Sequence, residues 1–360
     1  MSTLVLITGT GRSGTSTMSG AFHHLGLHVP GPYLGANESN PKGFFESRWA
    51  VRFHKQITEG ASIHEFDSRP EAFDLAQAAV TDELRAKLRG FLSRETNGHD
   101  QVVVKDPRSV WTQEVWRAAA AELGVDIRYI SMLRHPAEVV GSRTTYYAHP
   151  TDQARRRSYE TFNVARWING SLVSERETRG QSRAFVSYVD LLTDWRPVLT
   201  GLADDLGLHY DVDVAGGAPS AVDDFIDPGL RRHRVTWDDL EVPDALREIA
   251  EQVWSGLLRL QAAHGTDDAA SAGLDEQAER YRRLFSSSAD IAHDAVESER
   301  QGLRPRGSAR DGAPSAAPAP KPAPAGVDGM PVGQVGGRDL VKVVLARAGR
   351  KVGRLRRTRG

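Results

Sequence analysis

The sequence predicts an α/β fold, a three-layer sandwich in which helices cover both faces of a central parallel sheet. Four short apolar runs are typical of strands buried on both faces, at residues 3–8, 101–105, 127–133 and 184–189. Helical patterns lie between them, for example over residues 112–124, and strands that alternate with helices favour parallel pairing. Ligands of such sheets bind beyond the carboxyl ends of the strands, so we look for chemistry at each strand end.

The first run, TLVLIT, leads into a glycine-rich loop, GTGRSGTS, at residues 9–16. The next segment, TSTMSGAFHHLGL, has Met18, Phe22 and Leu25 at helical spacing and Gly26 as its stop. This order of strand, loop and helix predicts a phosphate site, because the N–H groups of a helix N-terminus favour an anion. The alternative interpretation is a glycine turn that binds nothing.

The cation of this loop differs from that of nucleoside triphosphate enzymes. Those enzymes have Lys directly after the second Gly, where it reaches the β- and γ-phosphates, and a following Ser or Thr that helps to hold Mg²⁺. Here Thr15 stands at that position, and the cation of the loop is Arg12. We therefore expect a ligand with a shorter anionic chain and no metal, and no spacing of His, Asp and Glu suggests a metal site.

The third predicted strand ends in LRHPAEVVGS, which places Ser142 eight residues after Arg134. Pro136 suits the first position of a helix, and such a helix would bring both side chains onto one phosphate. A surface ion pair and a solvated serine are the alternatives. The fourth run continues as SYVDLL, which contains Tyr188.

In these motifs the chain resembles the sulfotransferases that use 3′-phosphoadenosine 5′-phosphosulfate (PAPS), especially their bacterial members, over roughly residues 4–235. The resemblance implies a P-loop-like fold with PAPS as the donor. It implies that Arg134 and Ser142 bind the 3′-phosphate and that Tyr188 approaches the adenine. The implied 5′-phosphosulfate loop consists of Gly11, Arg12, Ser13, Gly14, Thr15 and Ser16.

The chain departs from the family pattern in two places. The C-terminal Arg-Lys-Gly contact to the 3′-phosphate is missing, and Arg231 and Arg232 in DPGLRRHR are candidate replacements. Thr17 stands where animal relatives have a tryptophan that stacks on the adenine.

The resemblance also implies catalytic roles. Arg12 and the N–H groups of residues 13–16 would stabilise the charge that develops on the leaving phosphate, and Lys105 would contact the sulfonate. Many relatives have a catalytic His after this Lys, but VVVKDPR has none. The candidate bases are Glu46, in a segment that resembles the one supplying a carboxylate in other bacterial members, and Asp106. The alternatives are an exposed acid before a helix for Glu46 and a turn residue for Asp106.

The expected function is transfer of a sulfonate group from PAPS to an acceptor hydroxyl by in-line displacement, on a small molecule or on a sugar or glycolipid. Arg108 would serve the structure or an acidic acceptor. A rival is a Mg²⁺-dependent P-loop kinase or nucleotidase, which Thr15 disfavours. Another is an inactive nucleotide-binding module tethered by a basic tail.

The composition limits the compartment and the partners. The 360 residues include no Cys, which excludes disulfides and thiolate sites, and the apolar run at residues 4–7 is too short for a signal peptide. We expect a cytoplasmic protein. Residues 338–360 contain nine Lys or Arg and one Asp, so the rest of the chain is acidic and nucleic acid is not an expected partner.

The predicted organisation has three parts. A catalytic domain spans residues 1–300, a Pro-, Ala- and Gly-rich linker spans residues 301–338, and a basic tail spans residues 339–360. The linker has too few bulky residues to form a core and is expected to be disordered. The tail has apolar residues at helical spacing and would lie on an anionic membrane surface as a helix, or else be a solvated charge run.

Overall fold

The computed structural model describes residues 2–38, 40–147, 153–231 and 234–303. Contacts separate the chain into two units, Met1–Glu299 and Arg300–Gly360, and the first unit contains the sheet. The predicted linker beyond residue 303 and the predicted basic tail lie outside the described residues.

The predicted parallel sheet is confirmed. Its strands are β1 (Thr3–Thr8), β2 (Gln101–Lys105), β3 (Asp126–Leu133) and β4 (Arg183–Ser187). The order across the sheet is β2-β1-β3-β4, and every neighbouring pair is parallel. β1 therefore lies between the two strands whose ends carry the other predicted motifs.

Helices fill the connections between the strands and also follow the last strand. The N-terminal half contains α1 (Thr15–His24), α2 (Arg48–Gly60), α3 (Ala72–Ala78), α4 (Asp82–Thr96), α5 (Gln113–Leu123), α6 (Pro136–Tyr147) and α7 (Gln153–Glu177). The C-terminal half contains α8 (Tyr188–Thr193), α9 (Trp195–Leu206), α10 (Ala221–Phe225), α11 (Asp244–Ala262), α12 (Asp268–Ile291) and α13 (His293–Leu303). Short 3₁₀ turns form at η1 (Pro107–Trp111), η2 (Pro228–Leu230) and η3 (Trp237–Asp239). Among the described residues, no helix is long and apolar enough to cross a membrane.

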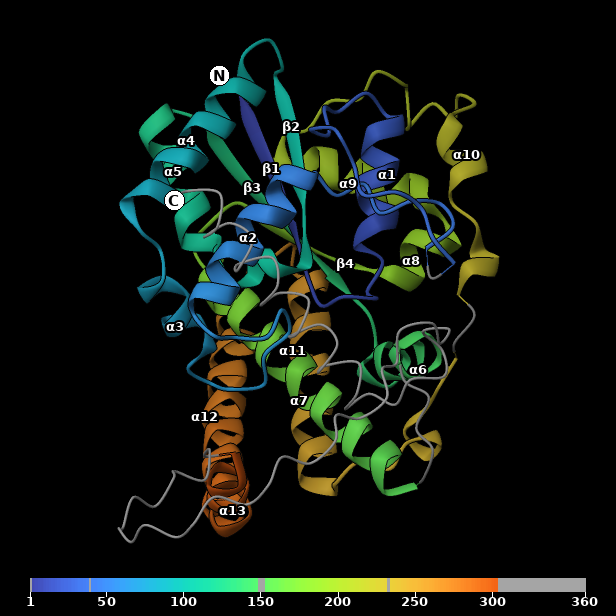
Figure 1. Cartoon of the computed structure of the whole chain (residues 1–360). Coiled ribbons are helices and arrows are strands. Elements are labelled where there is room, and N and C mark those ends of the chain that lie inside the picture. Colours follow the sequence, from blue (N-terminus) through green and yellow to red (C-terminus); the bar gives the residue numbers. More distant parts are fainter. Residues whose placement is uncertain (1, 39, 148–152, 232–233, 304–360) are drawn as a thin grey trace, which may run out of the picture. The chain divides into compact units, whose positions relative to one another are not determined.

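The side chains of β1 divide between the two faces of the sheet. Val5 and Ile7 pack with α1, α8, α9 and α10 on one face, whereas Leu4 and Leu6 pack with α2 to α5 on the other. Successive residues of a strand point to opposite faces, so an uninterrupted apolar strand has to be covered on both sides. Figure 1 shows these layers, with α1 and α9 on one side of the strands and α4 and α5 on the other.

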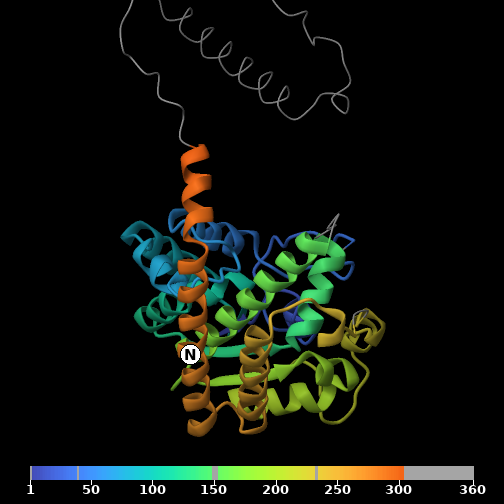
Figure 2. The ribbon, with the colours of Figure 1, turned by 90° about the horizontal axis from the view of Figure 1, so that it is seen from below.

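A third apolar cluster covers β3 and β4. Leu133 and Phe185 pack there with side chains of α6, α7, α11 and α12. The last two of these helices, α11 and α12, lie side by side (Figure 2). This cluster fixes α6, which follows β3 directly and carries part of the candidate site.

The fourth strand ends at Ser187 rather than at residue 189. The hydroxyl of Ser187 accepts a hydrogen bond from the Asp190 N–H (3.3 Å), so the chain turns at once into α8. Tyr188 is the first residue of that helix and not part of the strand. The prediction extended the strand because YV is as apolar as the run before it.

Gly9, directly after β1, lies where the loop approaches β3 closely, and a substitution there tests this approach. Its φ is +118°, and a Cβ there would lie 2.7 Å from the Met132 carbonyl oxygen. We expect Gly9→Ala to lower the free energy of unfolding by about 2 kcal/mol or more, because strained backbone and a clash with main chain add up.

The matched control is Gly90→Ala in α4, where an added Cβ meets nothing within 4 Å. Alanine favours the helix there, so we expect this variant to raise the free energy of unfolding by about 0.5–1 kcal/mol. Urea unfolding measures both variants, and equal stability of the two would contradict the close approach at Gly9.

Candidate active site

A cavity of about 510 Å³ lies at the carboxyl edge of the sheet. The parallel register aligns Ile7 of β1 with Lys105 of β2, and Thr8 with Ser131 of β3, so the segments after these strands meet at this edge. The volume falls within the usual range of small-molecule sites. Its charged lining residues are Arg12, Glu46, Glu65, Lys105, Arg108, Arg134 and Arg143.

The glycine-rich loop forms one wall of the cavity. Arg12 (φ 76°) and Gly14 (φ 90°) both adopt the left-handed region, which turns the chain sharply into α1. A Cβ on Gly14 would lie 2.2 Å from Cδ2 of Tyr188, so only glycine fits under that ring. The Met18 N–H donates to the Gly14 carbonyl (3.1 Å), and the N–H groups of the preceding turn therefore have no acceptor within the helix. That end of α1 can bind an anion.

Most predicted loop residues line the cavity, but Ser13 does not. Ser13 is fully buried, its hydroxyl lies 2.6 Å from the Thr10 hydroxyl, and its N–H donates to the Thr10 carbonyl (3.2 Å). It therefore stabilises the shape of the loop instead of facing a ligand. The predicted loop residues that line the cavity are Gly11, Arg12, Gly14, Thr15 and Ser16.

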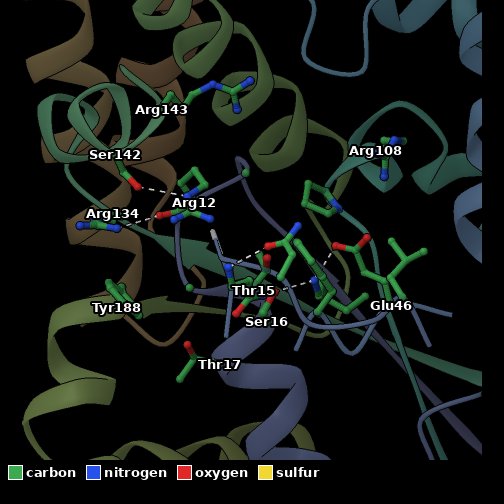
Figure 3. Close-up of a pocket in the computed structure, with 18 of the residues that line it drawn as sticks. Arg12, Thr15, Ser16, Thr17, Glu46, Arg108, Arg134, Ser142, Arg143 and Tyr188 are labelled. Atoms are coloured by element: carbon green, nitrogen blue, oxygen red, sulfur yellow. Dashed lines mark hydrogen bonds and ion pairs between the residues drawn. The ribbon is translucent and has the colours of Figure 1, made fainter. Parts of the chain in front are cut away.

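The two predicted anion motifs contact each other. Nε of Arg12 donates to the Ser142 hydroxyl (3.0 Å), and Nη1 of Arg134 donates to the Arg12 carbonyl (3.0 Å). The guanidinium of Arg134 also lies over the Tyr188 ring, 5.0 Å from its centroid. Figure 3 shows Arg12 beside Ser142 and Arg134 at one end of the cavity. The loop after β1 and the segment after β3 thus form one continuous surface.

Glu138, which the sequence analysis missed, connects the two predicted arginines. Its carboxylate accepts from Nε of Arg134 (2.9 Å) and from Nη2 of Arg231 (2.5 Å). Burial alone would raise the pKa of Glu138, but the hydrogen bonds from Arg231 and Arg134 outweigh burial and hold the pKa below its usual value. Arg231 does not itself line the cavity, and Arg232 lies outside the described residues. The i, i+4 spacing of Arg134 and Glu138 was the available sequence signal.

Lys105 joins the loop to Glu46. Its ammonium donates to the Ser16 hydroxyl (2.9 Å) and to Oε1 of Glu46 (2.6 Å). Both partners of this ion pair are buried, with Lys105 1% and Glu46 6% exposed. The alternative interpretation of Glu46 as an exposed acid therefore does not hold. Figure 3 shows Glu46 at the end of the cavity away from Ser142.

The surroundings of Glu46 increase its affinity for a proton. Burial raises its pKa above the usual value, and the nearby Lys105 ammonium opposes this without outweighing it. The charge of Asp106 raises the pKa further. A buried carboxylate that lines a cavity and has a raised pKa is suited to accept a proton from a bound hydroxyl.

Asp106, the other candidate base, does not line the cavity. It is fully buried, and its Oδ1 accepts from the Arg108 backbone N–H (3.0 Å) and from Nη1 of Arg108 (2.8 Å). Its Oδ2 accepts from Nδ1 of His54 (2.9 Å). Burial would raise the pKa of Asp106, but His54 and Arg108 outweigh burial and hold the pKa well below its usual value. The geometry favours the turn interpretation, in which Asp106 is a permanent structural anion.

His54 also belongs to this network. Its Nε2 accepts from the indole N–H of Trp116 (2.9 Å), a group that can only donate. The proton of the ring is therefore on Nδ1, where it is donated to Asp106. Among the described residues, no group of three or more His, Asp or Glu side chains could hold a metal ion.

Comparisons with known proteins give structural similarity at low identity. No family model and no curated protein matches the chain. One similar solved structure is the sulfotransferase domain from the Synechococcus PCC 7002 olefin synthase, with 18% identity and a TM-score of 0.39, covering 72% of this chain and 96% of that chain. Another is the sulfotransferase domain from the curacin biosynthetic pathway, with 15% identity and a TM-score of 0.38, covering 72% of this chain and 98% of that chain.

The buried carboxylate of Asp106 gives a stability prediction. Asp106→Asn keeps the shape of the side chain but leaves Arg108 without its buried counter-charge. We therefore expect the free energy of unfolding to fall by about 3 kcal/mol at pH 7. Because folding lowers the pKa of Asp106, its contribution is present above its unfolded pKa of about 3.9 and is lost as the pH falls further.

Urea unfolding at several pH values measures this loss, with Glu83→Gln as the control. Glu83 forms an exposed i, i+4 pair with Lys87, and its removal should leave stability unchanged. An Asp106→Asn protein as stable as the wild type at pH 7 would refute the structural role.

Proposed function

We propose that the protein is a PAPS-dependent sulfotransferase that transfers a sulfonate group to an acceptor hydroxyl. The observation that carries this proposal is the contact of Arg12 with Ser142 and Arg134. Two segments predicted to bind anions, separated by more than a hundred residues, lie side by side in one cavity. A single ligand with two phosphate groups can therefore bind both.

The donor fits the cavity group by group. The N–H groups at the start of α1 and the guanidinium of Arg12 would bind the 5′-phosphosulfate. Arg134 and Ser142 would bind the 3′-phosphate, which would replace the present bond between Arg12 and Ser142. Tyr188 lies beside Arg134 and would contact the adenine. Arg231, tied to Arg134 through Glu138, would add positive charge behind the 3′-phosphate.

Negative charge develops on the leaving group during the reaction. The bond between sulfur and the bridging oxygen of the 5′-phosphate breaks, and a bond forms between sulfur and the acceptor oxygen. The products are the sulfonated acceptor and adenosine 3′,5′-bisphosphate. Arg12 and the loop N–H groups stabilise the phosphate oxygen that gains charge, so they act more strongly in the transition state than in the ground state.

The acceptor proton goes to Glu46. As the acceptor oxygen bonds to sulfur it loses its proton, and Glu46 is the buried carboxylate on the cavity wall with a raised pKa. Lys105 donates both to Glu46 and to Ser16 of the loop, so it lies between the base and the donor site. Its ammonium would orient the sulfonate oxygens while it keeps Glu46 in place.

The rival function, a Mg²⁺-dependent P-loop kinase or nucleotidase, differs in the lysine that contacts the loop. In a P-loop kinase that cation is the Lys at the position of Thr15, whereas here Lys105 reaches Ser16 from the end of β2. An inactive binding module would share this geometry but would not turn over. The expected acceptor is still a hydroxyl group of a small molecule, a sugar or a glycolipid.

Donor binding is testable without an acceptor. Adenosine 3′,5′-bisphosphate at 100 times its Kd should stabilise the fold by about 2.7 kcal/mol, which thermal unfolding detects. Arg134→Ala should weaken this binding at least tenfold, because the 3′-phosphate loses a charged partner. Arg89→Ala, which removes an exposed arginine paired with Glu122, is the control and should bind normally. Stabilisation by ATP with Mg²⁺ and not by the bisphosphate would overturn the proposal in favour of a kinase.

Glu46→Gln tests the base and separates the enzyme from an inactive module. We expect kcat to fall about 100-fold or more while affinity for the bisphosphate stays unchanged. In the wild type, activity should decline as the pH falls through the raised pKa of Glu46, above the usual carboxyl value of about 4.3.

The control for this variant is Glu59→Gln, on the exposed side of α2. Rates are measured as bisphosphate release from PAPS with a panel of hydroxyl acceptors. Wild-type turnover in Glu46→Gln, or an acid limb at the ordinary carboxyl pKa, would show that another group is the base.

A further inference from the structure

The cavity contains cations that the donor does not need. Arg12, Lys105 and Arg134 are assigned to the phosphosulfate and the 3′-phosphate, whereas Arg108 and Arg143 also line the cavity. In Figure 3 these two arginines lie along the side of the cavity opposite Tyr188 and Thr17. They are therefore on the side away from the predicted adenine contact.

Arg108 is held by partners that are costly to bury. Its backbone N–H and Nη1 both donate to Asp106, which is fully buried and also accepts from His54. The His54 ring in turn accepts from the indole N–H of Trp116. Removing a carboxylate from water is expensive, so this chain of contacts is not a chance surface ion pair. These contacts fix the guanidinium of Arg108 on the cavity wall.

Glu65 is the replaceable partner of Arg108. Its carboxylate accepts from Nη2 (2.6 Å), but the Glu65 side chain is 36% exposed, whereas that of Asp106 is fully buried. Nε of Arg108 is buried and has no hydrogen-bond partner among the described residues. An incoming anion can displace Glu65 without disturbing the buried half of the network.

Arg143 lines the same cavity, nearer to Ser142 (Figure 3), and contacts the residue that follows Glu65. Its guanidinium lies 4.6 Å from the centroid of the Phe66 ring, and Phe66 directly follows Glu65 in the chain. A Cβ on Gly11 would lie 2.7 Å from the Phe66 ring and 3.4 Å from Nη1 of Arg143, so this pair packs on the start of the phosphate loop. The dipeptide of Glu65 and Phe66 thus connects the two arginines.

A further arginine, Arg166, does not line the cavity but interacts electrostatically with Arg143. Arg166 of α7 has no hydrogen bond or ion pair with any described residue and stacks on the Phe162 ring at 4.5 Å. Burial lowers its pKa, and the charge of Arg143 lowers it further, while Asp67 and Glu65 oppose this. Asp67 is already engaged by Arg69 (2.8 Å).

We propose that Arg108 and Arg143 form a subsite for an anionic group, a carboxylate or a phosphate, carried by the acceptor. This inference rests on the proposed function in that it takes the bound molecule to be the acceptor. The acceptor hydroxyl then faces Glu46, and its anionic group is held against the Glu65–Phe66 wall. Planar guanidinium groups bind both kinds of anion through charge-assisted hydrogen bonds.

The test is calorimetric titration of the full chain saturated with adenosine 3′,5′-bisphosphate, which fills the two donor phosphate positions. The phosphate arm compares glycerol 3-phosphate with glycerol, and the carboxylate arm compares lactate with lactamide. We expect at least one anionic probe to bind ten times or more tighter than its neutral partner. The arm that shows this preference identifies the anion.

Variants locate the bound anion. Arg143→Gln should weaken the anionic probe at least tenfold while bisphosphate affinity changes less than twofold. Arg108→Gln should do the same, but it also disturbs the Asp106 network, so Arg143→Gln is the decisive variant. Arg283→Gln removes a largely exposed arginine of α12 and is the matched control. Lys105→Met tests binding at the sulfonate position and should leave the anionic probe bound.

Two results would overturn the subsite. One is equal binding of the charged and neutral probes in both arms. The other is loss of anion binding in Lys105→Met with retention in Arg143→Gln, which would place the anion at the sulfonate position. A titration with the bisphosphate alone reports on the proposed function separately. If the bisphosphate does not bind, the same probes and variants are measured on the unliganded protein.

Discussion

The parallel register of β1 with its two neighbours is the constraint from which the site follows. β1 lies between β2 and β3, so the glycine-rich loop emerges between Lys105 and the segment that carries Arg134. Because all strands point the same way, the segments that follow them begin at one edge of the sheet. The side chains of these segments therefore lie close together. Because β1 is apolar on both faces, helices have to cover both sides of it, which favours its place in the interior of the sheet. The layers of the fold and the location of the cavity therefore have one cause.

The electrostatics of the cavity depend on where its carboxylates lie. Glu138 lies behind the predicted 3′-phosphate site and holds Arg134 there, and Asp106 lies behind the wall and holds Arg108. Both have a lowered pKa and remain negatively charged. Glu46 lines the cavity itself and has a raised pKa. The same residue type therefore serves as a fixed counter-charge in two places and as a candidate base in a third, according to burial and partners.

The sequence was sufficient for the parts that depend on local patterns. Apolar runs predicted the strands, and Pro136 predicted the start of α6, which sets Ser142 in the turn that faces the loop. It was insufficient where a contact joins distant segments. The burial of Glu46 depends on Lys105, 59 residues later, and the role of Asp106 depends on His54, 52 residues earlier. No local spacing records these pairs, and for the same reason the contact of Phe66 with Arg143 was not predicted.

The central claim is that one nucleotide spans the loop of Arg12 and the pair of Arg134 and Ser142. The most direct measurement is a comparison of Kd for adenosine 3′,5′-bisphosphate and for adenosine 5′-monophosphate in the wild type and in Ser142→Ala. The account predicts that the wild type prefers the bisphosphate and that the variant loses much of this preference while its affinity for the monophosphate is little changed. Equal affinities for the two nucleotides in the wild type, or an unchanged preference in the variant, would contradict it.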